Sequence, residues 1–152
     1  MKIDITKRAE LNALLYNLRE NTEAKWGLMN PQNMIEHLAK ALEYSNGKKQ
    51  IAQRTTEEEA KRAKEMMIYT DAEMPKGIKG SLAGEFPDPI QFPYLDEAKN
   101  NLNKELDDFE TYFKNNPDAS FIHASLGRLN YKEWIVLHSK HFTHHFKQFG
   151  LI

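Results

Sequence analysis

Apolar residues recur at intervals of three and four along much of the chain, which is the spacing of amphipathic helices. In the first such stretch Leu11, Leu14, Leu15 and Leu18 share one face. Comparable stripes continue to the C-terminus and are separated by polar connections. The pattern predicts four long helices, over residues 6–20, 31–44, 95–115 and 131–149.

Residues that typically begin helices mark two of these boundaries. Asn30 precedes Pro31, which combines a capping side chain with a proline at the first helical position. Asn130 is followed three residues later by Glu133, which is the spacing of a capping box with asparagine in place of serine or threonine. Both signals place a helix start where the apolar stripe begins.

The remaining segments are less regular. Thr56 and the three glutamates after it predict a further, weakly amphipathic helix to about Tyr69. Residues 118–129 are expected to form a loop. Residues 71–93 contain four prolines and three glycines, so no regular element can run through them. Because long loops in compact domains are often functional, a lid or binding surface and a plain surface connection both stay open for 71–93.

Four long helices without an alternating strand pattern predict an all-α fold, namely a helix bundle. A length of 152 residues suits one domain that spans residues 1–152. A chain of this length can bury a hydrophobic core that is stable without disulfides or bound metals.

Composition and charge exclude several classes of protein. The chain has no cysteine, which rules out disulfides, cysteine-based zinc sites, iron–sulfur clusters and thiol nucleophiles. The formal net charge is −1 and the charges are mixed, so there is no basic stripe for a nucleic acid. No apolar stretch is long enough for a membrane span, and the N-terminal residues lack the apolar region of a signal peptide. We therefore expect a soluble cytoplasmic protein.

Histidines are concentrated near the C-terminus, where four of the six lie between residues 138 and 145. On a helix with roughly 100° per residue, His138, His141 and His145 fall within about 60° of one another, beside the apolar face. His141 and His145 are one turn apart, so their imidazoles can converge on one ion. His37, on the apolar stripe of the predicted 31–44 helix, is the candidate third ligand, because a buried ionisable group needs a partner.

A structural role for these histidines is the alternative, since core histidines are often simply hydrogen-bonded. The sequence also lacks the more specific metal motifs. It has no H-E-x-x-H of zinc proteases and no E-x-x-H of di-iron bundles, and its glycines do not form a phosphate-binding loop.

Three motifs resemble the DinB/YfiT-like superfamily. The first is Trp26-Gly27-x-Met29-x-Pro31-Gln32-x-Met34-Ile35-x-His37-Leu38. The second is the C-terminal Trp134-x3-His138-x2-His141-x2-His144-His145-x2-Gln148-Phe149-Gly150. The third, His123-x3-Gly127-x-Leu129, is similar to a stretch of one uncharacterised branch, although Ala124 and Leu126 stand where that branch usually has proline and phenylalanine.

The resemblance implies a four-helix bundle of up-down-down-up type with a long crossover connection. It also implies a three-histidine centre made by His37, His141 and His145, binding a divalent metal, usually zinc or nickel. Relatives use such a metal to activate a water or a low-molecular-weight thiol, and many of them are dimers, so a homodimer is one expectation. Beyond what the resemblance implies, four further residues could line or support the pocket. His138 is a candidate fourth ligand, proton shuttle or supporting residue, and His123 could reach the site from the preceding loop. Gln148 could orient a ligand, cap the helix or belong to an interface, and Trp134 is a candidate for the core or the pocket wall.

Two functions are consistent with this pattern. The first is a metal-dependent enzyme that hydrolyses a small-molecule substrate or transfers a thiol cosubstrate onto it, since three imidazoles leave coordination positions open. The second is a non-enzymatic helical bundle that binds a small molecule or a protein, with a structural or vestigial metal site. A structural metal contributes folding energy, so chelation would unfold the domain in the second case.

Overall fold

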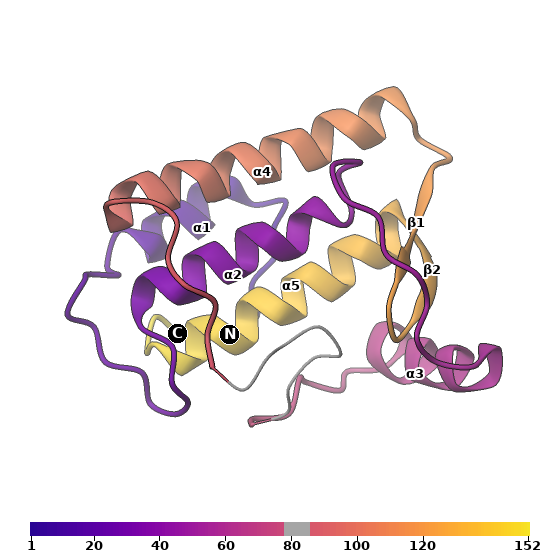
Figure 1. The fold of residues 1–152 in the computed structure, drawn as a ribbon, viewed down its shortest axis with the longest axis horizontal. Coiled ribbons are helices and arrows are strands. Elements are labelled where there is room, and N and C mark those ends of the chain that lie inside the picture. Colours follow the sequence, from indigo (N-terminus) through magenta and orange to yellow (C-terminus); the bar gives the residue numbers. More distant parts are fainter. Residues whose placement is uncertain (78–85) are drawn as a thin grey trace.

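The computed structural model describes residues 1–77 and 86–152. Over these residues the chain forms five helices and one two-stranded antiparallel sheet (Figure 1). In chain order the elements are α1 (Arg8–Leu15), α2 (Pro31–Glu43), α3 (Glu57–Tyr69), α4 (Leu95–Asn115), β1 (Ser120–His123), β2 (Gly127–Asn130) and α5 (Tyr131–Gln148).

The expectation of a pure all-α, four-helix, up-down-down-up bundle is therefore wrong. One reason is a fifth helix, α3, which forms where the sequence predicted a helix to about Tyr69 and which begins at a complete capping box. The Thr56 hydroxyl accepts a hydrogen bond from the Glu59 amide at 3.1 Å, and the Glu59 carboxylate accepts one from the Thr56 amide at 3.1 Å. Because this local signal satisfies two free amide groups, α3 forms although its apolar stripe is weak.

The second reason is a β-hairpin in residues 118–129, where a loop was expected. Strands β1 and β2 pair in antiparallel register, with Phe121 opposite Leu129. The His123 ring closes the turn, because its Nδ1 accepts hydrogen bonds from the amides of Ser125 and Leu126, both at 3.1 Å. Together with Gly127, whose φ is 75°, this side-chain contact forms the turn without the asparagine–glycine pair by which two-residue hairpins are usually recognised.

Helices α2 and α5 begin where their capping signals predicted. Asn30 accepts from the Asn33 amide at 2.7 Å, and Asn130 accepts from the Glu133 amide at 2.9 Å. In both cases the side chain three residues on returns a hydrogen bond to the capping residue. Helix α1 is shorter than the predicted 6–20 helix and ends at Leu15.

Helix α2 lies between α4 and α5 (Figure 1). Its apolar stripe is fully buried, as are the facing side chains of both neighbours, and all five helices contribute to one hydrophobic cluster. The central members of that cluster are Met34, Ile35, Leu38, Leu42, Leu102, Phe109, Phe142 and Phe146. Close packing of this kind holds α2 and α5 at a defined separation, which sets the geometry of anything built between them.

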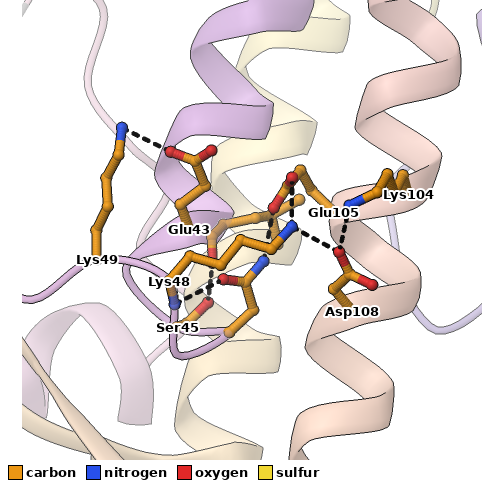
Figure 2. Close-up of polar contacts among 9 residues, drawn as sticks. Glu43, Ser45, Lys48, Lys49, Lys104, Glu105 and Asp108 are labelled. Atoms are coloured by element: carbon orange, nitrogen blue, oxygen red, sulfur yellow. Dashed lines mark hydrogen bonds and ion pairs between the residues drawn. The ribbon is translucent and has the colours of Figure 1, made fainter.

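A polar network fixes the C-terminal end of α2 to α4 (Figure 2). The Lys48 ammonium donates to Glu105 at 2.7 Å and to Asp108 at 2.6 Å, and the Asn46 amide donates to the other Glu105 oxygen at 2.7 Å. Glu105 is only 4% exposed. Because a buried carboxylate needs partners for its oxygens, this network specifies how the two helices align.

No helix in the described part of the chain combines the length and apolar character needed to cross a bilayer. Residues 71–77 and 86–93 contain no helix or strand. The middle of the segment 71–93, for which a lid was considered, lies outside the described residues.

Candidate metal centre

Three histidine side chains meet between α2 and α5. The Nε2 atoms of His37 and His141 lie 2.8 Å apart, and those of His145 and His141 lie 3.2 Å apart. The three rings meet edge to face, with centroids 4.8 to 4.9 Å from one another. The structure thus brings together the three residues that the sequence indicated as a ligand set.

Helix geometry explains why these side chains meet. On α2, His37 lies three residues after the buried Met34 and just before the buried Leu38. Its side chain therefore points to the side of α2 that faces α5. His141 and His145 are one turn apart on α5 and leave that helix on the side that faces α2. The packing of α2 against α5 then sets the distance between the two pieces of the site.

The spacing of the nitrogen atoms fits a metal ion. Two nitrogens bound at about 2.0–2.1 Å in a tetrahedral arrangement would lie about 3.3 Å apart. Two of the three nitrogen pairs, at 2.8 and 3.2 Å, are close to that separation, and all three nitrogens lie within 4.8 Å of one another. Three imidazole donors suit zinc, nickel, copper, iron or cobalt, so the donor set fits a divalent transition metal without selecting one.

Gln148 orients one of the three rings. Its Oε1 lies 2.7 Å from Nδ1 of His145, and its Nε2 donates to the backbone oxygen of Trp26 at 2.9 Å. An amide oxygen can only accept, so Nδ1 of His145 carries the proton and Nε2 keeps its lone pair for an ion. Gly27 makes room for this arrangement: it has a φ of 80°, and an added Cβ would lie 2.9 Å from Gln148 Nε2.

Burial keeps the three histidines neutral. Loss of hydration lowers the pKa of His37 to about 4 and that of His145 to about 3, with the neighbouring imidazoles adding to the effect on His145. The pKa of His141 is lowered well below its usual value by the same burial and by His37 and His145. Neutral imidazoles at physiological pH are the form that binds a metal.

A cavity of about 100 Å³ borders His37. Its charged groups are already paired: Lys40 binds Asp88 at 2.7 Å, and the Glu36 carboxylate accepts the Gln91 amide at 2.6 Å. Glu36 therefore fastens residues 91 and 92 to α2, and it is not a free base beside the histidines. Sequence reasoning missed this contact and Asp88, because both depend on a segment that approaches α2 from 48 or more residues away.

The other histidines and Trp134 lie elsewhere. His138 is buried, with Nε2 2.7 Å from the Ser45 hydroxyl, and it stacks on the core residue Trp134. His123 closes the hairpin turn described above. His144 donates through Nδ1 to the Met74 backbone oxygen at 3.2 Å. None of these four residues belongs to the three-histidine cluster.

Comparison of the chain with protein-family models, with curated proteins and with solved structures finds no match. Site geometry and sequence motifs are therefore the basis for a functional proposal.

Proposed function

We propose that this protein is a metal-dependent enzyme in which His37, His141 and His145 hold one divalent cation that activates a water or a low-molecular-weight thiol. The observation that carries the proposal is the convergence of three imidazole rings from two helices, whose ligand nitrogens all lie within 4.8 Å of one another. The resemblance of the two histidine-bearing motifs to DinB/YfiT-like proteins supports the same three ligands.

The donor set supports a reactive centre. A divalent cation held by three neutral imidazoles retains its charge and an open position, and so lowers the pKa of a water or thiol bound there. The protein supplies the ligands, fixes the His145 ring through Gln148 and leaves a cavity beside His37. Because the chain has no cysteine, a reacting thiol has to come from a cosubstrate.

Metal content tests the site directly. Protein purified without a histidine tag is analysed for metals, together with His37→Ala, His141→Ala and, as a control on the same helix, His144→Ala. We expect about one divalent ion per chain in the wild type and in the control, and a loss in the other two variants. Equal metal content in all four proteins would overturn the assignment.

Measurements of activity and of thermal stability distinguish a metal-dependent enzyme from a binding module with a structural metal. The metal-loaded protein is screened against ester, amide and alkyl-halide electrophiles with and without common cellular thiols, and chelated protein is the reference. Turnover that disappears with the metal supports the enzyme. No turnover, together with a large fall in melting temperature on chelation, would instead favour a binding module with a structural metal.

A further inference from the structure

A second, larger cavity of about 290 Å³ lies on another side of α5. Thr143, which lines it, is two residues from both His141 and His145, so it leaves the helix about 160° away from them. None of the three clustered histidines lines this cavity. The cavity is therefore separate from the proposed metal centre.

Hydrogen bonds hold both walls of the cavity against α5. On one side the Ile3 amide donates to the Thr143 hydroxyl at 2.8 Å, which fixes the N-terminal segment. On the other side Lys140 donates to the Thr70 backbone oxygen at 2.7 Å, and Lys147 pairs with Glu73 at 2.8 Å. These contacts form the cavity without a ligand, as is usual for small-molecule sites.

The interior is mostly apolar. The Thr143 hydroxyl on its floor already has partners within the protein, since it accepts from the Ile3 amide and donates to the Ser139 backbone oxygen at 2.7 Å. What is left for a ligand is the apolar surface of a small group of side chains: Ile3, Trp26, Met74, Ile135 and Val136. Burying that surface favours a hydrocarbon or aromatic body.

Positive charge lies around this apolar surface without full compensation. Among the described residues, Lys140 has hydrogen bonds to two backbone oxygens but no carboxylate partner. Lys76 lies over the Trp26 ring, with Nζ 4.3 Å from the ring centre. The carboxylate nearest to Lys2 is that of Asp71, which is fully exposed and 3.7 Å away. The cavity is lined by four lysines, Lys2, Lys76, Lys140 and Lys147, and by three carboxylates, Asp4, Asp71 and Glu73, so an anion at this position would offset the remaining positive charge.

We propose that this cavity binds a small amphipathic anion, a carboxylate with an apolar body of about six to ten carbons. The carboxylate lies beside Lys140 and Lys2, and the body packs on Val136, Ile3 and the Trp26 ring. The ligand class follows from the combination of an apolar interior whose polar groups are satisfied and a rim with excess positive charge. The proposal does not depend on a metal.

Octanoate is the probe for the test, and octylamine, which has the same chain length and the opposite charge, is its control. Each is titrated into chelator-treated protein by calorimetry and by amide chemical shifts. We expect saturable binding of octanoate alone, with shifts at residues 3, 26, 136 and 143. Equal affinity for octylamine, or shifts confined to other parts of the chain, would overturn the proposal.

Two kinds of variant test separately how charge and cavity shape contribute to octanoate binding. Lys140→Glu should weaken octanoate binding by about tenfold or more, whereas Lys132→Glu, an exposed lysine on the same helix, should change it less than about twofold. Val136→Phe, which fills the cavity and keeps every lysine, should also abolish binding. Circular dichroism checks that each variant is folded. Unchanged binding in both folded cavity variants would show that octanoate binds elsewhere.

Discussion

The Gln148 amide oxygen lies 2.7 Å from Nδ1 of His145, and this contact decides which nitrogen of that histidine faces the other two. The amide is 4% exposed, so no solvent competes for the bond. The same amide donates to Trp26 on its other side, which keeps it from rotating. Partners of this kind orient metal-bound histidines and raise their basicity.

Gln148→Leu should therefore weaken metal binding by about 10- to 100-fold, because the leucine cannot accept from His145. Gln148→Glu keeps an acceptor and should retain more of the affinity. Competition with a chromophoric chelator measures both variants, and ¹⁵N spectra of the imidazoles report the tautomer. Wild-type affinity in Gln148→Leu would show that the hydrogen bond has no positioning role.

Metal retention should extend to unusually acidic solution. Protons compete with the metal only near the pKa of each ligand, and the pKa of His37 is about 4 and that of His145 about 3. We expect the ion to remain bound as pH falls through 6.5, the usual histidine range, and to be released nearer pH 4. Metal content after dialysis at a series of pH values measures this. Half-release near pH 6.5 would contradict the burial of the ligands.

Stability of the metal-free protein should also depend on pH. Burial lowers the pKa of His138 to about 3 and that of His123 to about 4, so the unfolded chain binds more protons than the folded one between these values and pH 6.5. The contribution of these two neutral histidines to the free energy of unfolding is therefore fully present above pH 6.5. It is lost as pH decreases toward 3, and the loss is on the order of several kcal/mol. Urea unfolding at each pH measures the slope. His138→Gln, which removes one titrating group, should flatten it; an unchanged slope would contradict the role of His138.

The polar network between α2 and α4 should stabilise the fold chiefly through its buried carboxylate, Glu105. Glu105→Ala leaves the Asn46 amide without its acceptor and should cost about 2–3 kcal/mol. Lys104→Ala, which removes the exposed partner of Asp108 at 2.9 Å, should cost less than about 1 kcal/mol. Denaturant unfolding compares the two variants. Similar losses would show that burial of Glu105 does not matter.

Short-range signals in the sequence determined where most helices begin and which histidines could meet. Asn30 and Asn130 cap α2 and α5 as their spacing predicted, because a capping side chain acts on amides only three residues away. The same local periodicity placed His141 and His145 one turn apart, and the α2 stripe pointed to His37. These are properties of one helix at a time, so no partner is needed to infer them.

Only the tertiary structure decided how those pieces are arranged. The sequence predicted a loop where β1 and β2 pair, and although it predicted the helix after Thr56, it did not show that α3 packs against α5 and β2. His138 shares the histidine stripe with His141 but bonds to Ser45, because the end of α2 reaches its side of α5. The larger cavity likewise requires that residues 3 and 74, which are distant in sequence, meet beside the same helix. Contacts between distant segments follow from how whole faces pack, and no local spacing encodes them.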